Sequence, residues 1–220
     1  MIPVAAAVVT ATAGCGDGSG GLPSADFLLR GARASSGDMS SAHVDMKTTG
    51  SIPGLAVRSL NADVRAADDS EPGASYGTAA VAGMPVQFVE QDGRMYSKAA
   101  DGRYQPAPEQ VGGGRIPLPS SMIDPDHGLT GMLANFREPR TEVRETVDGK
   151  QAFRVTGTVP QADAAAWLPA IAGDANLTVW FATTGRHLPV RTRLTVPETG
   201  ATISVALSDL NRKVDVPPAD

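Results

Sequence analysis

Hydrophobicity alternates with a period of two along most of this chain, and that alternation constrains its fold more than any other feature. Apolar and polar side chains take turns within ten short segments, which is the pattern of strands with one buried face. The segments are residues 43–50, 55–64, 77–83, 85–91, 93–99, 103–107, 151–159, 177–183, 188–196 and 202–210. Several are separated by turn residues such as Asp92-Gly93 and Asp148-Gly149, which favour tight hairpins. The sequence therefore predicts a meandering antiparallel sheet of roughly eight to ten strands.

Composition supports a single globular domain with many turns. The 220 residues include 24 glycines and 17 prolines, and only 5% are aromatic, which favours short strands over a helical bundle. Hydrophobic residues make up 41% and charged residues 20%, the proportions of a soluble globular protein. The formal net charge of −5 argues against a nucleic-acid partner and against a basic membrane-binding patch, because both need clustered lysines and arginines.

Three segments depart from the alternation and have helical spacing. The first is residues 24–36, which Ser24 can cap. The second carries apolar residues at i, i+3, i+4 and i+7, and Asp126 can cap it; these residues are Leu129, Met132, Leu133 and Phe136. The third lies within residues 160–173, with Pro169 expected to kink its end. The expected fold class is therefore α+β, a single antiparallel sheet with helices packed on one face.

The N-terminus has the features of an exported lipoprotein. Residues 2–14 are uncharged and rich in Ala and Val, too short to span a bilayer, and they predict a signal peptide over residues 1–14 that is truncated at its start. Cys15 is the only cysteine, it follows small residues, and a Gly/Ser-rich linker continues to residue 23. Cys15 is therefore expected to carry the lipid that anchors the chain to the membrane. The alternative is a small buried residue.

No catalytic or metal-binding constellation is evident. The chain has no G-x-S-x-G motif and no nucleophile and base at a telling spacing. The three histidines are His43, His127 and His187. Asp124 and Asp126 lie beside His127, but a helix cap and a turn explain that cluster more simply than a metal site, because no second His or Glu lies at ligand spacing. We therefore expect neither an enzyme nor a bound metal or cofactor.

Four stretches together resemble one family of mycobacterial lipoproteins. They are SAHVDMKTTGSIPGL (41–55), VEQDGRMY (89–96), DPDHGLTGMLANF (124–136) and VDGKQAFRVTGTV (147–159). In combination they resemble the LppX/LprA/LprF/LprG lipoprotein family, over roughly residues 24–216. The resemblance implies a lipid-binding domain over residues 24–220, built as a strongly curved half-barrel sheet with helices on its concave face. It also implies a large apolar cavity between the sheet and the helices.

The resemblance further implies a function, a location and partners. The implied cargo is an acylated lipid or glycolipid of the phosphatidylinositol mannoside, lipoarabinomannan or triacylglycerol type. The carrier would be a monomer, anchored on the extracytoplasmic face of the cell membrane, and would move lipid toward the outer envelope. A membrane exporter of the major facilitator type is an implied partner.

The expected lipid-binding residues are the apolar side chains on one face of the strands, together with the apolar residues of the segment near 130. They are Val57, Ala79, Val81, Phe88, Leu129, Met132, Leu133, Phe136, Phe153, Val155, Val179, Phe181, Leu194, Val196 and Val205. Each buried methylene contributes about 0.8 kcal/mol, so carrying a long acyl chain needs a dry cavity. The same residues could instead fill an ordinary core, which would make the chain a surface interaction or structural lipoprotein without cargo.

Overall fold

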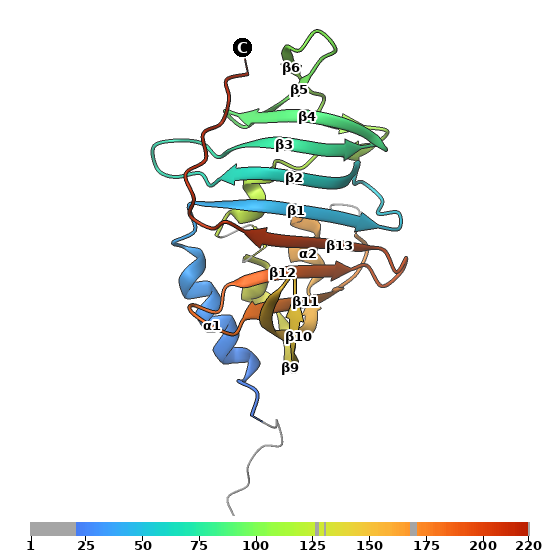
Figure 1. Cartoon of the computed structure of the whole chain (residues 1–220). Coiled ribbons are helices and arrows are strands. Elements are labelled where there is room, and N and C mark those ends of the chain that lie inside the picture. Colours follow the sequence, from blue (N-terminus) through green and yellow to red (C-terminus); the bar gives the residue numbers. More distant parts are fainter. Residues whose placement is uncertain (1–20, 126–127, 130, 168–170, 220) are drawn as a thin grey trace, which may run out of the picture.

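The computed structural model describes residues 21–125, 128–129, 131–167 and 171–219. One antiparallel sheet of eleven strands dominates it, in the order β6-β5-β4-β3-β2-β1-β13-β12-β11-β10-β9 (Figure 1). The strands are β1 (Ser41–Thr49), β2 (Val57–Arg65), β3 (Ala74–Val81), β4 (Met84–Gln91), β5 (Arg94–Lys98), β6 (Tyr104–Pro106), β9 (Arg137–Val147), β10 (Lys150–Val159), β11 (Ala175–Ala182), β12 (Pro189–Thr195) and β13 (Thr202–Ser208). A small separate pair joins β7 (Gln110–Val111) to β8 (Gly114–Arg115).

The sheet is curved and open, as expected for a half-barrel. Its edge strands β6 and β9 lie at opposite ends of the strand order, and the ribbon turns strongly at the β9–β11 end (Figure 1). Met46 of β1 pairs with Leu60 of β2 on one side and with Val205 of β13 on the other. The β1–β13 pair therefore joins strands β1–β6 to strands β9–β13. The α+β half-barrel prediction is confirmed.

Two-residue turns connect several of the strands, as the Asp-Gly pairs predicted. Asp92 and Gly93 have φ of 52° and 69°, and Asp148 and Gly149 have φ of 50° and 73°. Two consecutive residues with positive φ are the geometry of a type I′ hairpin turn, which favours Asp or Asn followed by Gly. The β4–β5 and β9–β10 hairpins thus follow directly from the sequence.

Helix α1 (Ala25–Ser36) confirms the first predicted helix. The Ser24 side chain accepts a hydrogen bond from the Phe27 amide at 3.3 Å, which satisfies one of the free N–H groups at the start of the helix. Leu28, Leu29 and Ala32 are buried in the same core as the inward-facing residues of the sheet. Helix α1 therefore covers the concave face at the β9–β13 end.

The second predicted helix is wrong as an α-helix. Within the predicted segment, residues 124–139, the structure has the short 3₁₀ helix η2 (Gly131–Asn135) instead, and a second one, η1 (Pro119–Ile123), precedes it. The expected cap Asp126 lies outside the described residues. The chain folds back on itself here, because the amide of Leu129 donates to the carbonyl of Met122 at 3.0 Å. Gly128 permits this, since a Cβ on it would lie 2.4 Å from the Asp124 carbonyl oxygen. Helical spacing identified buried residues but not their backbone conformation.

The third predicted helix is present in its first half. Helix α2 spans Gln161–Trp167, and Ala164 and Ile171 are buried. Pro169, expected to kink its end, lies outside the described residues. None of the helices within the described ranges is long and apolar enough to cross a membrane.

The convex face of the sheet carries a second, smaller apolar cluster. Trp180 of β11 is only 6% exposed and packs with Ala152 and Val190. Its indole Nε1 donates to Glu145 Oε1 at 2.7 Å, and the guanidinium of Arg193 lies 5.3 Å from the ring centroid. Charged side chains thus cover a tryptophan on the outer face. Their charged ends stay in water, and their aliphatic parts shield the indole ring from it.

Candidate functional site

An apolar cavity lies between the concave face of strands β1–β5 and a segment that crosses it. We call this segment, residues 107–123, the cover. The sheet contributes Met46, Val57, Leu60, Ala79, Val81, Val86, Phe88, Met95 and Ser97, and the cover contributes Ala107, Ile116, Pro117, Pro119 and Met122. Strand register explains the convergence, because Leu60 pairs with Ala79 and Ala79 with Val86, which places all three side chains on one face.

The cavity is narrow. Its volume is about 30 Å³. That is room for about one water molecule, not for an acyl chain. The expected apolar cavity is therefore present, but it is far smaller than the resemblance implies. An acyl chain would fit here only if the cover moved away from the sheet.

One buried carboxylate holds the cover to the sheet. Glu90 of β4 is fully buried on the concave face. Its carboxylate accepts hydrogen bonds from the Ser75 hydroxyl at 2.7 Å and from the Ser120 amide at 3.0 Å, and the Ser120 hydroxyl donates to it as well. Three donors satisfy most of the hydrogen-bonding capacity of a carboxylate that water cannot reach. Glu90 therefore fixes η1 against β3 and β4 beside the cavity.

The structure divides the fifteen expected lipid-binding residues into two groups. Val57, Ala79, Val81 and Phe88 line the cavity. The other eleven lie in the packed core that continues from it across the concave face: Leu129, Met132, Leu133, Phe136, Phe153, Val155, Val179, Phe181, Leu194, Val196 and Val205. Contact of any of the fifteen with lipid stays a prediction. The anchor residue Cys15 lies outside the described residues.

Several cavity residues were not foreseen, although the sequence signals them. Met46, Leu60, Val86 and Met95 face the cavity, and each occupies the inward position of its strand by the same alternation that selected Ala79 and Phe88. Glu90 follows Phe88 at a spacing of two, so its inward direction also follows from the alternation. A charged residue at an inward strand position is the signal for a buried polar contact.

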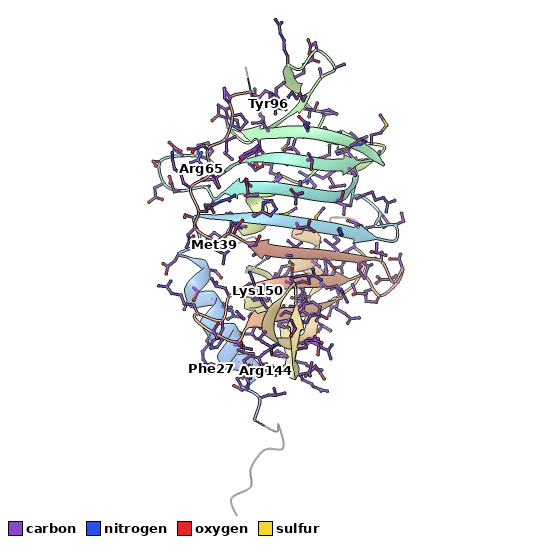
Figure 2. The ribbon with its side chains drawn as sticks, in the orientation of Figure 1. Phe27, Met39, Arg65, Tyr96, Arg144 and Lys150 are labelled. Atoms are coloured by element: carbon purple, nitrogen blue, oxygen red, sulfur yellow. The ribbon has the colours of Figure 1, made fainter. Side chains whose placement is uncertain are left out.

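A wider hollow lies at the opposite ends of the same strands. It has a volume of about 1090 Å³ and is bordered by charged side chains that include Arg65, Glu71 and Arg212; Arg65 is labelled in Figure 2. Ser75, Glu90 and Ser120 lie between this hollow and the apolar cavity. Its lining mixes charged and apolar side chains and is open to solvent, unlike the enclosed apolar cavity.

The convex face of β1–β3 carries a polar network centred on Asp63. His43 Nδ1 lies 2.8 Å from Asp63 Oδ1, the Tyr76 hydroxyl donates to the carboxylate at 3.0 Å, and Arg212 Nη2 donates to it at 3.1 Å. Burial raises the pKa of the Asp63 carboxyl, but the hydrogen bonds from His43 and Tyr76 and the charges of His43 and Arg212 outweigh it, so the pKa lies below its ordinary value. Nε2 of the His43 ring lies 3.1 Å from the Asn61 amide nitrogen, so both ring nitrogens have structural partners.

The other sequence candidates do not assemble into a reactive site. His187 Nδ1 lies 2.8 Å from the Ala182 carbonyl oxygen and its ring packs edge-on against Phe27. His127, in the segment near η2, lies outside the described residues. Within the part of the chain that the structure describes, no three His, Cys, Asp or Glu side chains form a group that could hold a metal ion.

Replacing Asp63 with asparagine is expected to destabilise the fold by about 1–2 kcal/mol at neutral pH, because the hydrogen bonds to a charged acceptor are lost. A lowered carboxyl pKa stabilises the folded state above the unfolded-state pKa of about 3.9, and this contribution is lost as the pH falls through the folded-state value. Urea unfolding near neutrality and at about pH 3 should therefore show a smaller difference in acid.

The matched control is Asp209→Asn, which removes a carboxylate that lies 3.7 Å from the same Arg212 but is mostly exposed. Its effect should stay within about 0.5 kcal/mol. An Asp63→Asn deficit of the same size at both pH values would contradict the prediction.

Comparison with known proteins decides the family. The model of the LppX_LprAFG lipoprotein family matches residues 24–216. The chain belongs to this family. The resemblance found in the sequence is thereby confirmed.

The relatives of this chain include lipoarabinomannan carrier proteins LprG from several mycobacteria. The one from Mycobacterium tuberculosis (strain H37Rv) is 31% identical, over 98% of this chain and 93% of the relative. The one from Mycobacteroides abscessus is 32% identical, over 98% of this chain and 94% of the relative.

Two solved structures have the same fold. LprF from Mycobacterium bovis superposes with a TM-score of 0.76 at 21% identity, over 89% of this chain and 96% of that one. LppX from Mycobacterium tuberculosis superposes with a TM-score of 0.68 at 23% identity, over 87% of this chain and 99% of that one.

Proposed function

We propose that this chain is a lipid carrier of the cell envelope, which holds acyl chains between the concave sheet and the cover. The observation that carries the proposal is the apolar cavity between β1–β5 and residues 107–123. Moving a long acyl chain through water costs on the order of 10 kcal/mol, at about 0.8 kcal/mol per methylene. A carrier lowers that cost only by enclosing the chain in apolar surroundings, which this cavity offers once the cover opens.

The proposed cargo is an acylated lipid or glycolipid. Its support is family membership together with the LprG relatives, which are lipoarabinomannan carrier proteins. Phosphatidylinositol mannosides, lipoarabinomannan and triacylglycerol all place long acyl chains where a dry cavity is needed. We propose that the chain acts as a monomer, with no enzymatic step, and receives or passes its cargo beside a membrane exporter of the major facilitator type.

The decisive experiment is purification without detergent from the native envelope, followed by mass spectrometry of extracted lipid. A carrier should yield acylated lipid in a fixed ratio to protein. The second candidate is a surface interaction or structural lipoprotein with a filled core, and the 30 Å³ interior favours it. If the protein repeatedly yields no lipid, even after incubation with envelope extract, the carrier function is ruled out and the second candidate is supported.

The anchor is proposed to be a lipid on Cys15, on the extracytoplasmic face of the membrane. Stable attachment takes two acyl chains or more, because a single chain binds reversibly. Cys15→Ala is therefore expected to move the protein from the membrane fraction to the medium, or to leave an uncleaved precursor. Fractionation and the mass of the mature N-terminus test this.

A matched control is Ser24→Ala, which changes a helix cap nine residues downstream and should leave fractionation unchanged. Membrane attachment and cleavage of Cys15→Ala that equal those of the unchanged chain would rule out the anchor.

A further inference from the structure

The hairpin between β3 and β4 ends in an apolar tip. Residues 80–86, Ala-Val-Ala-Gly-Met-Pro-Val, contain no polar side chain, and Met84 is 68% exposed. The β1–β2 connection lies against this tip, since the Ala82 amide donates to the Ala56 carbonyl at 2.9 Å. Residues 52–57 of that connection, Ile-Pro-Gly-Leu-Ala-Val, also lack polar side chains. We call residues 52–57 and 80–86 together the apolar rim.

The first residue of the turn in this tip is not of the type that the turn conformation favours. Ala82 and Gly83 have φ of 48° and 83°, the same pair of positive values as at Asp92-Gly93 and Asp148-Gly149. In those two turns the first position is Asp, the residue type that tolerates positive φ. At the β3–β4 tip it is Ala, which tolerates positive φ less well. An alanine at this position makes the turn less favourable and brings no gain in stability, which points to a functional requirement. Here that requirement is the absence of polar side chains from the tip.

The apolar rim is continuous with the cavity. Val57, Val81 and Val86 belong to the rim and also line the cavity wall. The paired residues Val81 and Met84 close the hairpin, and the Ala82 amide is hydrogen bonded, so these groups remain satisfied in an apolar medium. The hollow beside Arg65, which charged side chains border, lies at the other end of these strands. Within the β1–β4 region, the end that lacks polar side chains is therefore the end at residues 52–57 and 80–86.

We propose that the apolar rim inserts into the surface of a lipid bilayer and is the passage through which acyl chains move between the membrane and the cavity. The passage rests on the proposed carrier function, whereas the insertion does not. A bilayer is the occupant that fits, because the rim offers no charged or hydrogen-bonding side chain to a protein partner and leads directly to the apolar cavity. Binding through the rim needs no anionic lipid.

Insertion is tested with an environment-sensitive fluorophore on the chain from Gly21 to Asp220, which contains every described helix and strand and lacks Cys15. Nitrobenzoxadiazole is attached to Met84→Cys, and as a matched control to Arg94→Cys, an exposed site in the hairpin at the other end of β4. With phosphatidylcholine vesicles the label at 84 should shift to the blue and brighten several-fold, and the label at 94 should not change.

Three results would overturn the insertion. The label at 84 could show no change, or it could respond only to vesicles with anionic phosphatidylglycerol and lose the response in about 0.5 M salt, which marks electrostatic adsorption. It could also be blue-shifted without vesicles in proportion to protein concentration, which marks a contact between two copies of the chain. An equal response in phosphatidylcholine with and without salt supports the proposal.

The passage is tested with Ala82→Asp, which restores the residue type of the other two turns. The melting temperature should rise by about 2 °C, because the turn becomes more favourable, so a loss of function cannot be due to misfolding. Extraction of lipid from vesicles should fall on the order of tenfold, while loading from detergent-solubilised lipid stays unchanged. Undiminished extraction by Ala82→Asp would overturn the passage. Absence of loading in the unchanged chain would instead overturn the proposed carrier function and leave the insertion result standing.

Discussion

Replacing Trp180 with alanine is expected to lower the free energy of unfolding by about 3–5 kcal/mol, the usual cost of deleting a large buried aromatic side chain. The ring is almost fully buried between Ala152 and Val190 on the convex face. Its loss also leaves Glu145 without the indole donor and removes the ring beneath Arg193. Equilibrium urea unfolding of the chain from Gly21 measures the change.

The control is Phe27→Ala, which removes an aromatic side chain that is 50% exposed at the surface of α1 (Figure 2). The free energy of unfolding of this variant should fall by about 1 kcal/mol or less, because folding removes little of the Phe27 side chain from contact with water. A Trp180→Ala loss as small as that of Phe27→Ala would mean that the outer cluster contributes nothing to stability.

Replacing Ala79 with tryptophan is expected to reduce lipid capture on the order of tenfold or more. Ala79 lies on the cavity wall between Leu60 and Val86, so an indole there occupies the space that an acyl chain would take. Because the interior is narrow, the ring must also displace the cover, and the free energy of unfolding should fall by about 1–3 kcal/mol. Lipid content by mass spectrometry and urea unfolding are measured on the same preparation.

Thr78→Trp is the matched control, because Thr78 neighbours Ala79 on the opposite, exposed face of β3. It should bind lipid as the unchanged chain does and keep its stability. If both variants retain lipid equally, the cargo does not lie against Ala79. If neither they nor the unchanged chain contain lipid, the filled-core alternative holds.

Alternation and turn chemistry made most of the sheet predictable. The ten expected segments coincide with strands, and Asp92-Gly93 and Asp148-Gly149 form the turns that their types favour. The sequence did not predict β9, because its residues are exposed or half-buried throughout and charged side chains interrupt the apolar pattern. An edge strand of this kind is stabilised by its pairing with β10, which only the three-dimensional structure supplies.

The cavity was predictable in its walls but not in its size. Inward strand positions such as Ala79 and Phe88 follow from a period of two, whereas the distance between the sheet and the cover depends on contacts far apart in sequence. Glu90 and Ser120, 30 residues apart, set that distance by hydrogen bonds. The 3₁₀ path of the segment near Gly128 depends in the same way on its close approach to Asp124.

The central seam of the sheet joins the first strand of the chain to the last. Strand β1 pairs with β13 from His43–Ser208 to Thr49–Thr202, and the Asn211 amide donates to the Ser41 carbonyl at 2.9 Å. A chain synthesised from its N-terminus therefore presents β1 with one open edge until nearly all of the polypeptide is complete. The two meanders can form early from local contacts, but an interrupted chain lacking its final strand leaves the inner edges of both exposed. Such edges pair readily with other chains, so aggregation is most favoured just before this last step of folding.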